Sequence, residues 1–194
     1  LIFMVTAAFM DAKQIMSMPY TWIPSSEYFT TSTRTFFTNF QKAIVGNHGD
    51  NIFFRNLFNS LIVASVCSIT TVFLASLCGF GLAKYKFKGQ KAVFMAIMST
   101  MMIPFEAIMI PLYLVATKMK IINTIPGLII PFLVSAFGVF QMRQYLITFP
   151  TEYLDAARVD GMGEFGIFSM IVLPNSTPVI AILAVLFFRI QWDN

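Results

Sequence analysis

The sequence predicts an all-α integral membrane protein, built as a polytopic bundle of helices. Hydrophobic residues make up 57% of the 194 residues and charged residues 11%, and the mean hydropathy is +0.75. Soluble domains carry about 25% charged residues, so this chain lacks the side chains to cover a water-facing surface. A lipid-facing surface removes that difficulty because its side chains are apolar. Long apolar runs separated by short polar loops give the same prediction.

Three runs are long enough to cross a bilayer, which requires about 20 mostly apolar residues. They cover residues 57–82, 92–116 and 125–146. Two shorter runs, 1–9 and 177–190, are interpreted as part of a first helix and the last visible helix. We therefore expect one transmembrane domain over the whole chain, truncated at both ends.

The orientation of these helices is predicted from the Lys and Arg residues in the short loops, because cytoplasmic loops are enriched in both. Residues 84–91 contain four lysines, and residues 117–124 contain two. Residues 143–174 contain two arginines and must lie on the same side as the first loop. Six charges against two place these two loops in the cytoplasm, and residues 10–56 form an external segment.

The net charge of +4 does not indicate nucleic-acid binding, because the lysines lie between apolar runs and not on a phosphate-binding face. No cofactor or metal is expected. His48 is the single histidine, which excludes a histidine-based metal cluster. Catalytic residues are not expected either, since the sequence lacks a paired acid or an activated nucleophile within a span. The chain has no phosphate-binding loop, so energy must come from a partner or an ion gradient.

The polar segment 148–174 is predicted to form two short helices. Thr151 is a candidate cap for a helix over 152–160, and the acids Glu152 and Asp155 suit its first turn. Gly161 is suited to end that helix. A second helix is expected over 164–172, with Pro174 ending it.

The small residues in this pair of helices are compatible with two different roles for the segment. Ala156, Ala157 and Gly161 would let another protein approach the backbone closely, as suits a contact that transmits force. An amphipathic hairpin lying on the membrane surface explains the same pattern. The residues by themselves leave both interpretations open.

The spacing within this segment resembles the EAA loop of ABC importer permeases. That pattern is Glu-Ala-Ala, three residues, Gly, nine residues, Ile, one residue and Leu-Pro. Here Asp155 stands where the family has Glu, which keeps the charge and shortens the side chain by one methylene. The other matching positions are Ala156, Ala157, Gly161, Ile171, Leu173 and Pro174.

Further stretches are similar to the carbohydrate-uptake, maltose-permease-like branch of this family, the binding-protein-dependent transport system inner membrane components. The resemblance covers nearly the whole chain and implies the six-helix ABC importer permease fold, with the last helix missing. The similar stretches are 19–24 (PYTWIP), 80–89 (FGLAKYKFKG), 102–106 (MIPFE), 110–113 (IPLY), 143–145 (RQY) and 191–194 (QWDN).

The resemblance implies a permease subunit of an ATP-driven importer for sugars or oligosaccharides in the bacterial inner membrane. Such a permease pairs with a second one, usually as a heterodimer, and docks on a cytoplasmic dimer of ATP-binding subunits that hydrolyse ATP. An extracytoplasmic solute-binding protein delivers the solute, and membrane lipid surrounds the helices. The residues implied in the coupling loop are Glu152, Asp155, Ala156, Ala157, Arg158, Gly161, Leu173 and Pro174.

Two alternatives accompany this interpretation. The first is an ABC permease for another polar solute, such as a glycerol phosphate. The second is a self-contained secondary transporter, which would need coupling acids within the membrane. Glu106 is the one acid in a predicted span. It is interpreted either as lining the solute path or contacting a partner, or as reaching the outer headgroups between Pro104 and Pro111.

Overall fold

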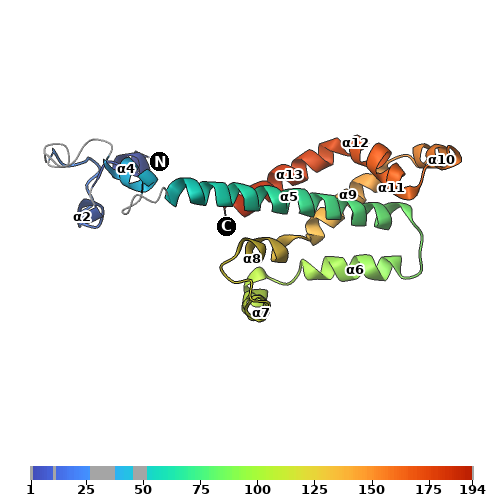
Figure 1. The fold of residues 1–194 in the computed structure, drawn as a ribbon, viewed down its shortest axis with the longest axis horizontal. Coiled ribbons are helices and arrows are strands. Elements are labelled where there is room, and N and C mark those ends of the chain that lie inside the picture. The colour runs from blue at the N-terminus through green and yellow to red at the C-terminus, as the bar shows by residue number, and fades with distance from the viewer. Residues whose placement is uncertain (1, 11, 27–37, 46–51, 194) are drawn as a thin grey trace. The chain divides into compact units, whose positions relative to one another are not determined.

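The computed structural model describes residues 2–10, 12–26, 38–45 and 52–193, and Figure 1 shows that these segments are helices joined by loops. The predicted all-α fold is confirmed. The chain divides into two compact units, Leu1–Phe58 and Asn59–Asn194.

The first unit contains α1 (Ile2–Ala7), α2 (Ala12–Ile15) and α4 (Thr38–Val45). The amide of Asn39 donates to the carbonyl oxygens of Ala8 and Met10, at 2.9 and 3.0 Å. These bonds satisfy carbonyls just beyond α1 that its own backbone leaves open. The external segment predicted over 10–56 lies partly outside the described residues, at 11, 27–37 and 46–51, and this includes His48.

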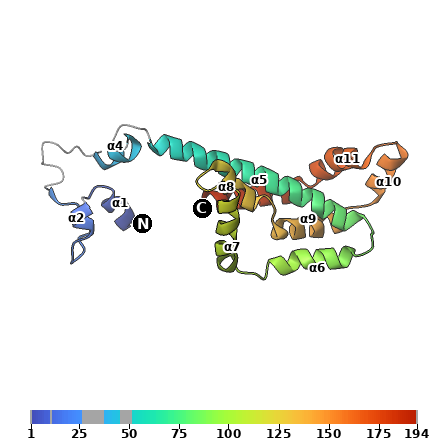
Figure 2. The ribbon, with the colours of Figure 1, turned by 60° about the horizontal axis from the view of Figure 1, so that its bottom comes forward.

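Residues 59–84 of the long helix α5 (Ile52–Lys84) form the axis of the second unit (Figures 1 and 2). Its 33 residues have a mean hydropathy of 2.3 in the most apolar window. At 1.5 Å per residue the helix is about 50 Å long, more than the thickness of a bilayer core. Among the described residues it is the one helix long and apolar enough to cross a membrane alone.

The run predicted as one helix over 92–116 is two helices in the structure. α6 (Gln90–Thr100) and α7 (Phe105–Lys118) are bent by 94°. The break lies at Pro104, whose backbone is extended (φ −64°, ψ 141°). Proline lacks the N–H that helix continuation needs, and it disfavours helical geometry in the residue before it.

The next run is bent as well. α8 (Ile125–Ile129) continues into a 3-10 turn, η1 (Ile130–Phe132), and α9 (Ala136–Thr148) follows at 45°. Ser135 caps α9 by accepting a hydrogen bond from the backbone N–H of Gly138. If each bent pair counts as one crossing, the described residues supply up to four spans.

The core of the second unit lies where α5, α9 and α13 (Thr177–Trp192) pack together. Glycines allow the closest approaches. A Cβ atom on Gly79 would lie 2.7 Å from Met142 Cβ, and one on Gly138 would lie 3.0 Å from Ala75 Cβ. Small residues at such crossings let helix backbones approach, as in other membrane bundles. Buried members include Val72, Ala75, Phe80, Val139, Met142 and Leu183.

Candidate functional site

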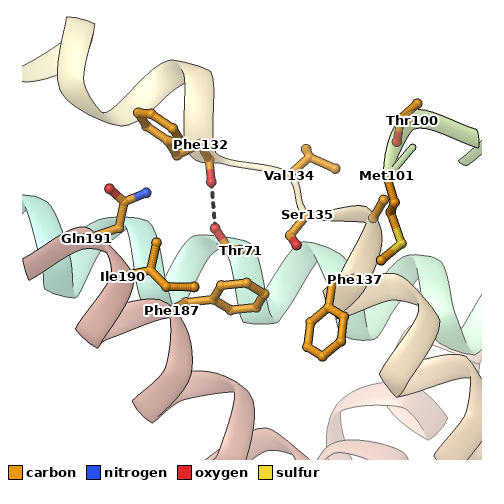
Figure 3. A pocket seen from close by; sticks show the side chains of 11 residues that line it. Thr71, Thr100, Met101, Phe132, Val134, Ser135, Phe137, Phe187, Ile190 and Gln191 are labelled. Atoms are coloured by element: carbon orange, nitrogen blue, oxygen red, sulfur yellow. Dashed lines mark hydrogen bonds between the residues drawn. The ribbon is translucent and has the colours of Figure 1, made fainter. Parts of the chain in front are cut away.

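An open cavity of about 340 Å³ lies beside the middle of α5 (Figure 3). Its wall combines hydroxyl and amide groups with aromatic rings, and the Thr71 hydroxyl donates to the carbonyl of Phe132 at 2.8 Å. The breaks that follow α6 and precede α9 both contribute to the wall. The lining residues are Thr71, Thr100, Met101, Phe132, Val134, Ser135, Ala136, Phe137, Phe187, Ile190 and Gln191.

Sequence reasoning did not find this cavity, because its residues come from five helical elements and the turns beside them and have no common spacing. Glu106, the predicted path residue, is not among its lining residues. It lies instead in the first turn of α7 and is exposed. A negative side chain is favourable at that position next to the helix N-terminus.

The polar segment predicted to couple to a partner forms four short helical pieces. They lie at one end of the second unit, beside the C-terminal end of α5, in both views of the ribbon (Figures 1 and 2). The pieces are α10 (Glu152–Val159), α11 (Glu164–Ile167), the π-helix η2 (Phe168–Val172) and α12 (Leu173–Asn175).

The two ends of α10 are set by different means. Gly161 has a φ of +81°, a left-handed conformation that glycine adopts without strain, and it ends the helix as the sequence predicts. The predicted side-chain cap by Thr151 is wrong. Thr151 has helical backbone angles, so its side chain is not placed to accept from the first turn. Its carbonyl instead accepts from the N–H groups of Leu154 and Asp155.

The two alanines of the predicted motif differ in burial, because consecutive residues of an α-helix point about 100° apart. Ala157 and Leu154 are buried in the core, at 5% and 1% exposure. Ala156 is exposed, and so are the apolar side chains of Tyr153 and Val159. One face of α10 is therefore anchored within the chain and the other presents small and apolar groups. Sequence reasoning missed Tyr153 and Val159, although both are hydrophobic residues outside the buried stripe.

The other residues predicted in the coupling segment differ in how exposed they are. Glu152 and Pro174 are exposed, and Leu173 is half-buried. Pro174 does not end the second helix as predicted. It lies within α12, which follows the π-helix directly and continues to Asn175, and the break comes at Ser176 before α13.

The π-helix anchors this segment to α5. Ile167, Phe168 and Val172 are buried. The Phe168 ring lies 6.0 Å from that of Phe73 and 5.7 Å from that of Phe80, measured between centroids. Short π-helical stretches often occur at functional sites in helices, and this one directs the Phe168 ring toward the long helix.

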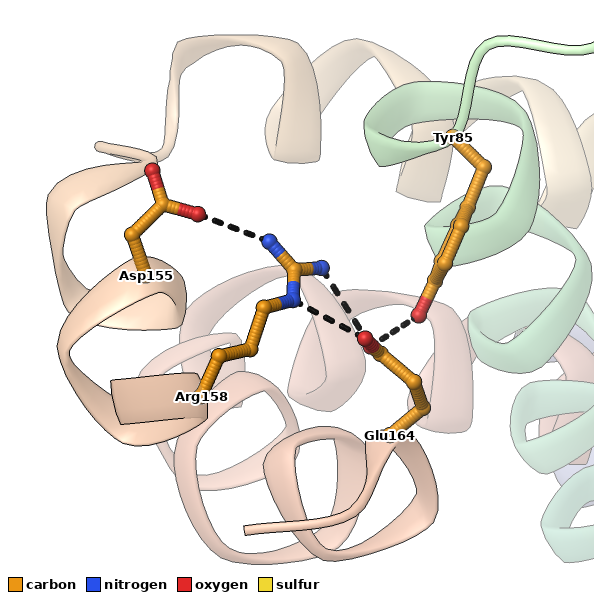
Figure 4. Close-up of polar contacts among 4 residues, drawn as sticks. All are labelled: Tyr85, Asp155, Arg158 and Glu164. Atoms are coloured by element: carbon orange, nitrogen blue, oxygen red, sulfur yellow. Dashed lines mark hydrogen bonds and ion pairs between the residues drawn. The ribbon is translucent and has the colours of Figure 1, made fainter. Parts of the chain in front are cut away.

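A polar network joins the first loop after α5 to the coupling segment (Figure 4). Arg158 donates to Asp155 at 2.8 Å and to both carboxylate oxygens of Glu164, at 2.9 and 3.3 Å. The hydroxyl of Tyr85 donates to Glu164. Tyr85 and Glu164, 79 positions apart in the sequence, thus meet at one carboxylate. Of these four residues, sequence reasoning identified only Asp155 and Arg158.

These contacts shift the pKa values of Glu164, Arg158 and Tyr85. Hydrogen bonds from Arg158, and then from Tyr85, lower the pKa of Glu164. The bond to Glu164 raises the pKa of Arg158. Burial is the first cause that raises the pKa of Tyr85, and its bond to Glu164 is the second. Near neutral pH, Glu164 is therefore an anion held by a cation and a neutral hydroxyl donor.

Comparison with known proteins identifies the family of this chain. Residues 71–192 match the model of the binding-protein-dependent transport system inner membrane component. The chain belongs to this family. It is therefore an inner membrane transport component, and the matched region contains both the cavity and the coupling segment.

Relatives of this transport component have sugar or glycerol phosphate transport in their names. The arabinooligosaccharides transport system permease protein AraQ of Bacillus subtilis is 38% identical over 76% of this chain and 52% of its own length. The lactose transport system permease protein LacG of Rhizobium radiobacter is 36% identical over 71% and 50%. The sn-glycerol-3-phosphate permease protein UgpE of Yersinia enterocolitica is 30% identical over 97% and 65%. The match to AraQ and LacG spans about half of their lengths.

A solved structure has the same fold. A bacterial ABC transporter that imports the acidic polysaccharide alginate superposes with a TM-score of 0.76 over the whole of this chain and 64% of that chain. The sequence identity is 19%, so this likeness concerns the fold alone. Among the residues described, no group of three or more His, Cys, Asp or Glu side chains is placed to hold a metal ion.

Proposed function

We propose that this chain is the permease subunit of an ATP-driven, binding-protein-dependent importer, and that residues 148–174 couple it to a cytoplasmic ATP-binding subunit. The supporting observation is the two-sided character of α10. Leu154 and Ala157 fasten one face to the core, and Ala156 with its apolar neighbours is exposed on the other. A helix held in this way moves with the bundle when a partner moves its exposed face.

The proposed solute is a neutral sugar or oligosaccharide. Two relatives are named for arabinooligosaccharides and lactose. The wall of the cavity offers the hydroxyl oxygens of Thr100 and Ser135 as hydrogen-bond acceptors, and aromatic rings for contact with the faces of sugar rings.

A glycerol phosphate is the second candidate, since a relative is named for it. Binding a phosphate dianion favours nearby Arg or Lys side chains. The lining residues that the structure describes carry no formal charge, which favours the neutral solute.

The proposed partners are a second permease, usually a different chain, a dimer of ATP-binding subunits, an extracytoplasmic solute-binding protein and membrane lipid. The whole chain is one transmembrane domain in this proposal. The basic loop after α5 and the coupling segment face the cytoplasm together. Their shared side is supported by the Tyr85–Glu164 contact between them.

A crosslinking experiment tests the coupling role. A cysteine replaces Ala156 in the full-length protein, co-expressed with its ATP-binding subunit carrying cysteines around its surface cleft. We expect a crosslink whose yield changes with ATP. The matched control is a cysteine at Ala157, which is buried and should react much less. Equal absence of crosslinks at both positions, in an assembled complex, would contradict the proposal.

A further inference from the structure

The contact among Tyr85, Glu164 and Arg158 joins the residue after α5 to the coupling helix α10. We propose that Tyr85 and Glu164 are positioning residues that lock the coupling helix α10 to the C-terminal end of α5, so that α10 and α5 move as one body. This inference rests on the proposed function, because it assigns these residues a role in transmitting the partner's movement. Neither residue belongs to the motif that predicts the coupling segment.

The end of α5 is a firm attachment point. The carbonyl of Leu82, left open at the end of the helix, accepts from the side chains of Gln90 and Arg143 at 2.8 and 3.3 Å. The ammonium group of Lys84 donates to the carbonyl of Phe149 at the end of α9. Side chains from two other elements therefore hold the turn that leads to Tyr85.

The ring of Tyr85 is held in place as well. It packs edge-on against Phe80, with 5.4 Å between the centroids and 86° between the planes. Phe80 is itself buried and also contacts Phe168. With the ring fixed, the hydroxyl points toward α11 and meets the Glu164 carboxylate, as Figure 4 shows.

Glu164 is the junction of the network. One carboxylate oxygen accepts from Tyr85 and from a terminal nitrogen of Arg158, and the other oxygen accepts from Arg158 Nε. Paired bonds between a guanidinium and a carboxylate fix orientation as well as distance. The other terminal nitrogen of Arg158 holds Asp155, so the chain of bonds runs from α5 through α11 into α10.

This geometry sets the rotation of α10 about its own axis. Leu154 and Ala157 anchor the helix by apolar packing, which has little directional preference. The bonds around Arg158 are directional, and they fix where the exposed face with Ala156 points. Without Glu164, Arg158 keeps only the local bond to Asp155, one turn away on the same helix, and the link to α5 is lost.

The test uses the full-length importer with all its subunits in proteoliposomes and measures solute transported per ATP hydrolysed. Tyr85→Phe keeps the ring and removes only the hydroxyl. Losing one net hydrogen bond of about 1 kcal/mol corresponds to roughly a fivefold change in an equilibrium, so we expect this coupling ratio to fall about fivefold. Glu164→Gln is expected to lower it similarly, and the double variant no further, because both act through one link.

Tyr113→Phe is the matched control. Tyr113 is an exposed tyrosine of α7, and its loss of a hydroxyl should leave the ratio unchanged. Assembly of each variant is checked by gel filtration. If Glu164→Gln fails to assemble, the test rests on Tyr85→Phe.

Two results would overturn the inference. One is an unchanged coupling ratio in Tyr85→Phe. The other is a double variant whose loss equals the product of the single losses, since independent sites give that result. The Ala156 crosslink separates this inference from the proposed function. If the crosslink forms and responds to ATP while Tyr85→Phe transports normally, only the positioning role fails. If the crosslink is absent, the coupling function itself fails.

Discussion

The helices α6 and α7 and the coupling segment, residues 148–174, differ in burial in the opposite sense to their hydrophobicity. α6 and α7 are the more apolar, yet all of their side chains are at least partly exposed within the described structure. The coupling segment carries most of its charges on α10 and α11, yet it places large side chains in the core. Its buried residues are Leu154, Ala157, Ile167, Phe168 and Val172.

This difference shows that hydrophobicity and burial are separate properties in a membrane protein. Apolar side chains on α6 and α7 are stable against lipid or another membrane subunit, and need no cover from their own chain. The charged side chains of the coupling segment are exposed, while its buried apolar residues join the core of the second unit. The segment with fewer apolar residues consequently contributes more of them to the core.

The largest expected effect is the loss of stability when a buried aromatic ring of the coupling segment is removed. Phe168→Ala removes a buried ring between Phe73 and Phe80, and substitutions of this kind cost about 3–5 kcal/mol. Met95→Ala in α6 removes a side chain that is 57% exposed and should change stability by less than about 0.5 kcal/mol. Thermal unfolding of both variants in one detergent measures the difference. Equal losses would contradict the contrast between the segments.

An effect of intermediate size is expected at two glycines with positive φ, one beside each of the two regions compared. Gly161 follows α10 and Gly89 precedes α6, with φ of +81° and +88°, and a Cβ atom at either position meets open space. A β-branched residue in this conformation costs about 1–2 kcal/mol, so Gly161→Val and Gly89→Val should destabilise the protein similarly.

A transport measurement should distinguish Gly161→Val from Gly89→Val. Only Gly161→Val changes the end of the coupling helix, so we expect it alone to lower the solute transported per ATP. Gly161→Asn is the control, because Asn adopts left-handed geometry more readily and should retain more coupling. Uncoupling of similar size in Gly89→Val would show that the effect is not specific to α10.

The smallest expected effect is a pH dependence of the polar network. The pKa of Glu164 is lowered in the folded protein, so its contribution to stability is present above the unfolded value of about 4.3. That contribution is lost as the pH falls through the folded pKa. Because the Glu164 and Arg158 side chains are 49% and 36% exposed, we expect no more than about 1 kcal/mol. Unfolding midpoints of the protein and of Glu164→Gln, followed from pH 7 to pH 3, should converge at the acidic end.

The sequence by itself determined the all-α membrane class, the apolar run within α5, and the bounds of α10 to within one residue. It also located the stop at Gly161. These features depend on local causes: the length of an apolar run, the spacing of apolar and charged side chains, and the backbone freedom of glycine. The family match then confirmed the class that the coupling pattern implied.

Only the tertiary structure decided which apolar residues are buried, which of the two alanines is exposed, and which side chains line the cavity. It also decided how sharply the run over 92–116 bends at Pro104. The proline is visible in the sequence, but a proline in a helix can cause anything from a mild kink to a right-angle bend. The Tyr85–Glu164 contact joins residues 79 positions apart. Such contacts depend on how α5, α9 and the coupling segment pack together, and no local pattern in the chain encodes that arrangement.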